Sequence, residues 1–292
     1  MHKDLGTVHD CTEHPDQCDY DINYKDGYSS MGVLLTDKFS LPMRNDRPNL
    51  AFGCGYDQQG EKEELEVDGI LGIGRGTGDL VSQLKQQGLI TENVVGHCLS
   101  SHGGGYLFFG GDVPSTGVTW LPMVQEYTIY YSPGKVTWNL DVLLKYELSK
   151  TPRVAVFDSG SAYSYVHKDT YELLIQAVDV TLQDSTLQKV PDDPELTQCW
   201  RYNQPIQSVD DVKHEFEPLE LTFTHGASQE RGNVCLGIHN GSEHGMGELN
   251  IIGDITMQNH LVVYDNERAR IGWVRASCDI MPGSAPIIAS RL

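Results

Sequence analysis

An aspartate within residues 155–161, Ala-Val-Phe-Asp-Ser-Gly-Ser, is the strongest candidate in this sequence for acid–base chemistry. The apolar residues before Asp158 predict a buried strand, and Gly160 permits a tight turn directly after it. Such a turn can present the Asp158 carboxylate inward, where Ser159 and Ser161 can hydrogen-bond to it or to a facing loop. Taken alone, however, Asp158-Ser159-Gly160-Ser161 is explained more simply as an aspartate that ends a strand, followed by an ordinary turn.

Other patterns that could carry chemistry are weaker. The 11 histidines show no His-Glu-x-x-His or other metal-ligand spacing, so we expect no metal site. Residues 72–76, Gly-Ile-Gly-Arg-Gly, depart from the Gly-x-Gly-x-x-Gly pattern of dinucleotide sites, so we expect no cofactor. Asn240-Gly241-Ser242 is a candidate N-glycosylation sequon, which matters only if the chain is secreted.

The overall charge narrows the classes of partner. The 292 residues carry 21 Lys and Arg against 41 Asp and Glu, which gives a net charge of −20. A field of this sign repels phosphate backbones and anionic lipids, so nucleic-acid and membrane-surface roles are disfavoured. No window approaches the roughly 18 consecutive apolar residues of a membrane span. The length allows one large domain or two medium ones.

The predicted elements that must position Asp158 are mostly short strands. Two helices are also predicted: residues 79–87, which end before Gly88, and residues 169–184, with Asp169 as the N-cap. The clearest strands are predicted over residues 105–110, 153–157, 260–264 and 270–275. The last two of these are separated by Asp-Asn-Glu-Arg and predict a hairpin.

Two similar segments suggest an internal duplication. Ile70-Leu71-Gly72 (the first-half motif) resembles Ile251-Ile252-Gly253 (the second-half motif), since each has two large aliphatic residues followed by glycine. Asp158 precedes the second-half motif by 93 residues. Two such elements far apart in the chain hint at a duplicated β lobe.

Many short segments together resemble the pepsin-type aspartic endopeptidases of plants, in the nucellin-like and nepenthesin-like branch of peptidase family A1. The similarity runs from about Asp4 to Asp279. The matching segments are Cys18-Asp19-Tyr20, Tyr24-Lys25-Asp26-Gly27, Ser29-Ser30-Met31-Gly32-Val33-Leu34, Phe52-Gly53-Cys54-Gly55-Tyr56-Asp57, Gly69-Ile70-Leu71-Gly72, Gly96-His97-Cys98, Phe157-Asp158-Ser159-Gly160, Cys235-Leu236-Gly237, Ile251-Ile252-Gly253-Asp254 and Ile271-Gly272-Trp273.

This resemblance implies a mainly β, bilobal pepsin-like fold in which each lobe supplies one Asp-Thr/Ser-Gly loop. We expect an N-terminal lobe over residues 1–126, a C-terminal lobe over residues 127–279 and a tail over residues 280–292. The two aspartates of the family share a proton across a bound water and hydrolyse peptide bonds in peptide or protein substrates.

The resemblance also assigns roles to single residues. Asp158 would be the catalytic aspartate of the second lobe. Ser159 would brace the two catalytic loops, Gly160 would form the turn, and Ser161 would orient the carboxylate. Tyr24 would be the tyrosine of the flap over the substrate, although a half-buried strand tyrosine is a fair alternative.

The first catalytic loop of the family has no counterpart in this sequence. A loop placed 93 residues before Ile70 would precede Met1. Asp4-Leu5-Gly6-Thr7 resembles the motif but lacks an apolar strand before it and lies only 20 residues before Tyr24. We therefore expect an N-terminally truncated member with an incomplete first lobe, inactive on its own. The alternative is a catalytically silent binding or inhibitor-like protein of the same fold, and a homodimer that shares Asp158 is disfavoured.

The odd number of cysteines agrees with the expected truncation, because the partner of one cysteine would lie in the missing N-terminal part. Cys11 with Cys18 and Cys199 with Cys235 can close short loops, and the resemblance pairs Cys98 with Cys278, which leaves Cys54 unpaired. Disulfides point to a secreted or vacuolar, endomembrane location for the full-length family, yet the sequence as written begins without a signal peptide. A monomer is expected.

Overall fold

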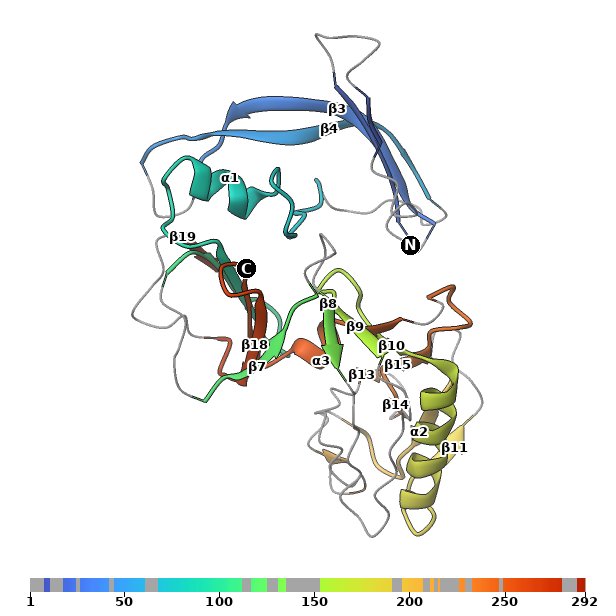
Figure 1. The fold of residues 1–292 in the computed structure, drawn as a ribbon. Helices are drawn as coiled ribbons and strands as arrows, with labels where there is room; N and C mark the ends of the chain where they lie inside the picture. The colour runs from blue at the N-terminus through green and yellow to red at the C-terminus, as the bar shows by residue number, and fades with distance from the viewer. Residues whose placement is uncertain are drawn as a thin grey trace.

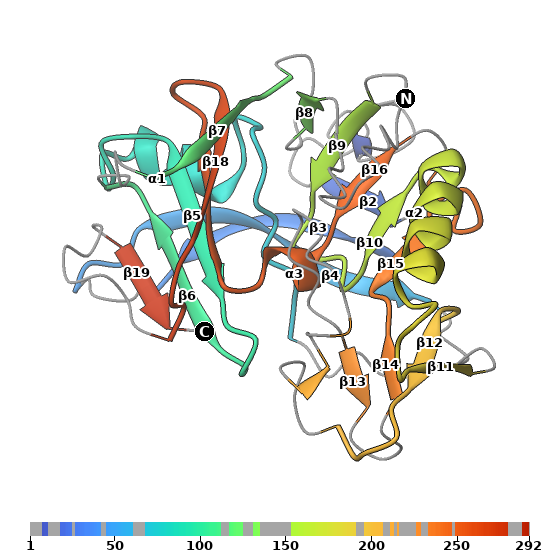
Figure 2. The same cartoon turned by 90° about the horizontal axis from the view of Figure 1, so that it is seen from below.

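The structure is a computed structural model, and its described residues form mainly antiparallel β-sheets together with three helices (Figures 1 and 2). It describes residues 8–10, 18–24, 27–41, 45–60, 68–111, 117–124, 131–134, 153–190, 196–206, 211–212, 215, 226–228, 233–246, 249–279 and 288–291.

A four-stranded antiparallel sheet forms the first part of the chain. Its strands are adjacent in sequence order, so β1 and β4 are its edges in the described structure. The strands are β1 (Val8–Asp10), β2 (Asp19–Asn23), β3 (Ser29–Lys38) and β4 (Asn49–Gln59). Figure 1 shows β3 and β4 as a layer at one end of the molecule, with α1 beneath it.

A six-stranded antiparallel sheet combines segments from both halves of the sequence. Its order is β19-β6-β5-β17-β18-β7, and it contains the predicted hairpin as β17 and β18. The strands are β5 (Val94–Leu99), β6 (Gly105–Phe109), β7 (Thr119–Pro122), β17 (His260–Asp265), β18 (Arg270–Arg275) and β19 (Ile288–Arg291). The segment expected to be a tail therefore contains a strand, and the expected lobe boundary crosses this sheet.

A five-stranded mixed sheet carries Asp158. The parallel pairing of β9 with β16 places Phe157 beside Ile252, so Asp158 and Gly253 follow neighbouring strand ends. The strands, in spatial order, are β15 (Ile238–Asn240), β10 (Ser164–Val166), β16 (Asn250–Ile252), β9 (Arg153–Phe157) and β8 (Tyr131–Gly134).

A smaller sheet extends from the same half of the chain. Its order is β11-β12-β14-β13, and the register pairs Cys199 with Cys235 across β12 and β14. The strands are β11 (Gln188–Val190), β12 (Cys199–Arg201), β13 (Gly226–Ser228) and β14 (Asn233–Cys235).

The helices lie close to their predicted positions. Helix α1 (Leu80–Gln86) begins after Asp79, whose carboxylate accepts from the Ser82 N–H, and Gly88 follows with a positive φ of 69°. Helix α2 (Lys168–Thr181) is capped by His167 instead of the predicted Asp169, because the His167 ring accepts from the Asp169 N–H. The prediction of Asp169 as the N-cap was therefore wrong by two residues.

Among the described residues, the largest cluster of buried apolar side chains contains residues of the four-stranded, six-stranded and five-stranded sheets. It includes Val81 and Leu84 of α1, Val262 of β17, and both Phe157 and Ile252 at the ends of β9 and β16. Helix α3 (Asp254–Met257) lies between the six-stranded and five-stranded sheets in both views (Figures 1 and 2). Within the described residues, no helix has the length and apolarity needed to cross a membrane.

Candidate active site

Local hydrogen bonds connect the Asp158 carboxylate to its own loop. Asp158 is half-buried and directly follows β9. Its Oδ1 accepts from the Gly160 N–H at 2.9 Å, and its Oδ2 accepts from the Ser161 hydroxyl at 2.8 Å. Ser159 is exposed at the tip of the turn. The sequence expectation that Ser161 can hydrogen-bond to this carboxylate agrees with the geometry, and the Gly160 N–H is a second donor that was not anticipated.

The second-half motif packs against this loop. The Asp158 N–H donates to the Ile252 carbonyl at 3.0 Å, and the Asp254 N–H donates to the Ser161 carbonyl at 2.7 Å. A Cβ at Gly253 would lie 2.1 Å from the carbonyl oxygen of Tyr163. Residue 253 therefore has to be glycine for the two loops to approach this closely.

A pair of buried hydroxyls beneath the loops was not singled out in the sequence. The Ser164 and Thr256 side-chain oxygens lie 2.6 Å apart, and Ser164 Oγ also accepts from the Gly253 N–H at 3.0 Å. The signal in the sequence was weak: a serine in an otherwise aromatic and aliphatic strand, six residues after Asp158, and a threonine three residues after Gly253.

One further carboxylate lies beside these loops. Burial raises the pKa of Asp254, and a hydrogen bond from the Gln258 amide at 3.2 Å opposes part of that rise. Asp254 is the first residue of α3, so its N–H is occupied by Ser161 while its carboxyl group faces Gln258. The Asp254 backbone, and not its carboxyl group, therefore makes the hydrogen bond to the Asp158 loop.

Tyr24 lies in the turn that joins β2 to β3. Its N–H donates to the Tyr28 carbonyl at 2.7 Å, and the Gly27 N–H donates back to the Tyr24 carbonyl at 3.2 Å. Gly27 adopts a φ of 87°, which favours glycine in a tight hairpin turn. Tyr24 thus belongs to a hairpin of the four-stranded sheet, whereas Asp158 belongs to the five-stranded sheet.

The first-half motif has no comparable packing among the described residues. Ile70 is 63% exposed and Leu71 is 53% exposed. A Cβ at Gly72 would meet no described atom within 4 Å. Leu35 and Tyr56, on β3 and β4 respectively, are also large exposed apolar side chains in this half of the chain.

The cysteines that the structure describes follow the expected pairs. Cys98 is bonded to Cys278 and Cys199 to Cys235, with sequence separations of 180 and 36 residues. Cys18 is disulfide-bonded, whereas Cys11 lies outside the described residues. Cys54, in the edge strand β4, is an exposed free thiol.

The sequon at Asn240 lies in a buried strand. Asn240 is the last residue of β15, and its Nδ2 donates to Glu243 at 2.7 Å while its Oδ1 accepts from the Ser242 N–H at 3.1 Å. The adjacent His239 is also buried, which lowers its pKa to about 4. A glycan on Asn240 would have to displace these contacts, so the folded structure argues against this site.

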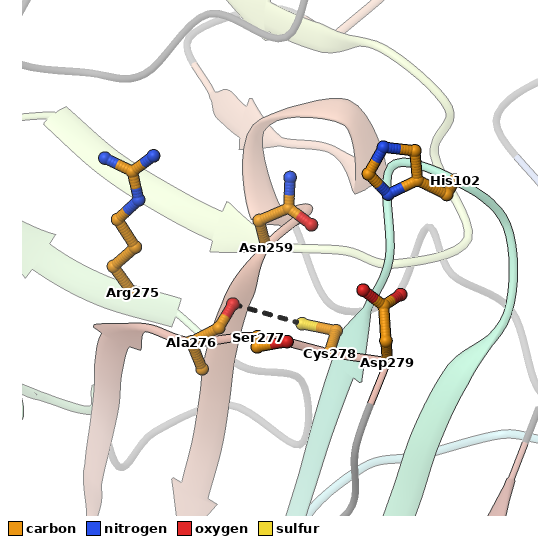
Figure 3. A pocket seen from close by; sticks show the side chains of 7 residues that line it. All are labelled: His102, Asn259, Arg275, Ala276, Ser277, Cys278 and Asp279. Atoms are coloured by element: carbon orange, nitrogen blue, oxygen red, sulfur yellow. Dashed lines mark hydrogen bonds between the residues drawn. The ribbon is translucent and has the colours of Figure 1, made fainter.

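A pocket of about 380 Å³ lies at one end of the six-stranded sheet (Figure 3). It is lined by His102, Asn259, Arg275, Ala276, Ser277, Cys278 and Asp279. Its lining includes neither Asp158 nor the loop around Gly253, so it is separate from the candidate chemistry. Among the described residues, no group of three or more His, Cys, Asp or Glu side chains could hold a metal ion.

Comparisons with family models and with solved structures agree on the fold. The model "Xylanase inhibitor N-terminal" matches residues 2–111, and "Xylanase inhibitor C-terminal" matches residues 141–275. The aspartic proteinase from Irpex lacteus superposes with a TM-score of 0.64 at 16% identity, covering 90% of this chain and 82% of that one. Soybean basic 7S globulin gives a TM-score of 0.63 at 17% identity, covering 89% and 73%. At these identities, the two structures establish a shared fold.

The sequence relatives establish the family. An aspartic proteinase of Oryza sativa subsp. japonica (the rice relative) is 44% identical, with 100% of this chain and 76% of the relative covered. "Aspartic proteinase nepenthesin-2" of Nepenthes gracilis is 25% identical, with 90% and 61% covered. The chain has a pepsin-like fold and belongs to the plant pepsin-like family of aspartic endopeptidases.

Proposed function

We propose that Asp158 is one carboxylate of a catalytic dyad that activates water to hydrolyse peptide bonds. The observation that carries this proposal is the carboxylate at the end of β9, held by the Gly160 N–H and the Ser161 hydroxyl and packed against the second-half motif. In such a dyad, one carboxylate removes a proton from water. The other, protonated, polarises the scissile carbonyl and later helps to protonate the leaving amine.

The remaining site residues have supporting roles in this proposal. Ser161 fixes the orientation of the Asp158 carboxylate, and Gly160 supplies the turn and a backbone donor. Ser159, exposed at the tip, braces the loop against the opposite catalytic loop. Tyr24 covers a bound peptide from the tip of the β2–β3 hairpin. The substrate is a peptide or protein. The chain is a monomer with a partial N-terminal lobe over residues 1–126 and a C-terminal lobe over residues 127–279.

We further propose that residues 1–292 by themselves lack peptidase activity. The sequence contains one Asp-Ser-Gly and no Asp-Thr-Gly, so it supplies one member of a dyad. The exposed first-half motif supports this proposal, because no described loop covers Ile70 or Leu71 as the Asp158 loop covers Ile252. A lone carboxylate cannot share a proton in the way that the mechanism requires.

A second candidate function is a catalytically silent binding or inhibitor-like protein of the same fold. It is favoured by the two family models, whose descriptions name xylanase inhibitors, and by the single Asp-Ser-Gly. The two candidates differ in a simple way: a binding protein does not require Asp158, whereas a peptidase does.

The branch and the location of the protein are part of the proposal. We place the protein in the nucellin-like and nepenthesin-like branch, and the nepenthesin-2 relative supports the nepenthesin-like part of this assignment. The disulfides Cys98–Cys278 and Cys199–Cys235 support a secreted or vacuolar location, since such bonds persist in oxidising compartments.

The first experiment assays the purified 292-residue chain on an unfolded protein substrate, with and without pepstatin, from about pH 3 to about pH 7. We expect no pepstatin-sensitive cleavage. A companion chimaera joins, to residue 1 of this chain, an N-terminal segment of a plant aspartic proteinase that contains an Asp-Thr-Gly loop after an apolar strand. We expect the chimaera to cleave the substrate.

Asp158→Asn in the chimaera should lower kcat at least about 100-fold, because the dyad loses its acid–base partner. Asp184→Asn, which changes an exposed aspartate beyond α2, is the matched control and should leave kcat unchanged. Cleavage by the 292-residue chain that Asp158→Asn abolishes would contradict the proposed inactivity. If the chimaera cleaves equally well with and without the Asp158→Asn substitution, the proposed role of this residue is wrong.

A further inference from the structure

Two loops that are distant in sequence are joined beneath the candidate site by side-chain hydroxyls. Ser164, in β10, is 1% exposed, and Thr256, in α3, is 6% exposed. Their oxygens lie 2.6 Å apart although 92 residues separate them in the chain. Ser164 Oγ also accepts from the Gly253 N–H at 3.0 Å. One buried serine therefore binds both the second-half motif and the helix that follows it.

These contacts continue to Asp158 through the backbone. The Asp254 and Ile255 N–H groups donate to the carbonyls of Ser161 and Ala162, at 2.7 Å and 3.2 Å. In the opposite direction, the Asp158 N–H donates to the Ile252 carbonyl at 3.0 Å. A shift of residues 252–256 must therefore move the backbone on both sides of the Asp158 carboxylate.

The surroundings make the hydroxyl pair costly to disturb. Val166 and Met257, which follow Ser164 and Thr256 in β10 and α3, are fully buried apolar side chains. Without the Ser164 hydroxyl, the Gly253 N–H and the Thr256 hydroxyl lose a partner in a region that water does not reach. Buried polar groups without partners destabilise a structure, so the loops would rearrange to satisfy them.

The two loops lie so close together at Gly253 that residue 253 cannot carry a side chain. A Cβ at this position would lie 2.1 Å from the Tyr163 carbonyl oxygen and 2.7 Å from the Ser161 carbonyl oxygen. Gly253 has no side chain that could pack against the facing loop, so hydrogen bonds to the backbone hold the two loops at this separation. The Ser164 hydroxyl is the side-chain group that binds the Gly253 N–H.

We infer that Ser164 and Thr256 are positioning residues of the candidate active site. Their hydroxyl pair fixes residues 252–254 against the Asp158 loop and thereby sets the direction of the Asp158 carboxylate. Neither residue touches that carboxylate in the structure, since its contacts are Gly160 and Ser161. The catalytic meaning of this role rests on the proposed function, whereas the mechanical coupling does not.

The test uses the 292-residue chain and amide hydrogen exchange measured by NMR. Ser164→Ala and Thr256→Val remove one hydroxyl each, and Ser164→Thr and Thr256→Ser retain it. We expect both hydroxyl-removing variants to accelerate exchange of the Asp158 and Asp254 amides at least about tenfold relative to the β17 amides of Val262 and Val263. The hydroxyl-retaining variants should stay within about threefold of the parent chain.

A spectroscopic signature reports the carboxylate itself. The Gly160 N–H donates to Asp158 Oδ1, so its proton resonance should move upfield in Ser164→Ala and Thr256→Val as that bond lengthens. Ser100→Ala is the matched control, because Ser100 is another buried serine that loses a 2.7 Å bond to Asp279 and a 3.2 Å bond from His102. It should lower the melting temperature without moving the Gly160 resonance or the exchange ratio.

The outcomes separate this inference from the proposed function. If the exchange ratio and the Gly160 resonance are unchanged in Thr256→Val and Ser164→Ala, the hydroxyl pair is only a structural contact and the inference is wrong. Thr256→Val preserves side-chain volume and serves as the test if Ser164→Ala fails to fold. The readouts do not depend on peptide cleavage, so an inactive Asp158 would overturn the proposed function and leave the coupling established.

Discussion

The first-half and second-half motifs share a sequence pattern but have opposite environments. Ile251 and Ile252 are 7% and 5% exposed, whereas Ile70 and Leu71 are 63% and 53% exposed. Gly253 is in close contact with the Tyr163 and Ser161 carbonyls, whereas no described atom lies near the place where a Cβ at Gly72 would be. The pattern alone therefore does not bury an apolar segment; a loop such as residues 158–164 must pack against it.

The strands of the two regions also differ in what lies beside them: β4 is an edge strand of the four-stranded sheet, whereas β9 has a strand on each side. In β4, an edge strand of the described sheet, the backbone of Ala51 is paired with the side-chain amide of Gln83 in α1, at 2.7 Å and 3.0 Å. Strand β9, in contrast, is paired with the strand β16 along the whole length of β16. Exposed apolar side chains near an edge strand are a surface that favours association or aggregation.

The largest expected difference comes from truncating matched apolar residues. Ile252→Ala should lower the free energy of unfolding by about 2–5 kcal/mol, because Ile252 belongs to the main buried cluster. Leu71→Ala should change it by no more than about 0.5 kcal/mol, because most of that side chain already contacts water. Chemical denaturation of the two variants and the parent chain measures both values. Equal losses would show that the first-half motif is buried in solution and would break the comparison.

Alanine at the two glycines tests the packing directly. Gly253→Ala should destabilise the chain by about 1–3 kcal/mol or more, since the new methyl group would collide with backbone oxygens that cannot move independently. Gly72→Ala meets no described atom within 4 Å and should be neutral or slightly stabilising, by up to about 1 kcal/mol. Thermal melting of the pair is sufficient. A destabilised Gly72→Ala variant would indicate that a loop covers this glycine after all.

Local sequence signals were enough to predict the elements around Asp158. The apolar run before it forms β9, the hairpin forms β17 and β18, and both predicted helices are present. These predictions hold because each depends on short-range periodicity and turn residues, which the sequence displays directly.

Long-range pairing could not be predicted in the same way. The six-stranded sheet unites β5 with β17 and β6 with β19, and no local pattern specifies such distant partners. The Ser164–Thr256 pair was missed for the same reason, since 92 residues separate two common side chains. The buried environment of Asn240 also depends on its position in β15, which the sequon does not reveal.

Acid should reduce the difference between the two regions. Burial lowers the pKa of His239 to about 4, with a further lowering from His244 and an opposing effect of Glu243. The Tyr163 and Tyr165 rings pack against the same imidazole, at 4.9 Å and 5.4 Å between centroids. In the unfolded chain a histidine titrates near about 6.5. As the pH falls from about 6.5 to about 4, the unfolded chain therefore binds a proton that the folded chain does not, and stability decreases.

Hydrogen exchange, corrected for intrinsic rates, measures this effect at several pH values. Protection of β10 and β16 should decrease between about pH 6.5 and about pH 4, whereas residues 49–60 and 68–76 contain no histidine and should change less. His239→Phe keeps an aromatic ring in the cluster and should reduce the pH dependence. His97 is buried with a pKa lowered to about 4 as well, so part of the dependence should remain. An unchanged pH profile in His239→Phe would contradict this explanation.

The smallest energetic effect is expected at Cys54, in the exposed edge strand of the first region. A thiol reagent should label the native chain once, at Cys54, because the other described cysteines are disulfide-bonded and Cys54 is accessible. Cys54→Ser should abolish the label and change the free energy of unfolding by less than about 0.5 kcal/mol, as for other exposed side chains.

Cys235→Ser is the matched comparison in the second region and should lower the free energy of unfolding by about 2–5 kcal/mol through loss of the Cys199–Cys235 bond. Peptide mapping identifies the labelled residue, and denaturation gives the energies. If Cys54 reacts only after unfolding, the β4 edge is covered in solution, and the contrast between the two regions is smaller than the structure indicates.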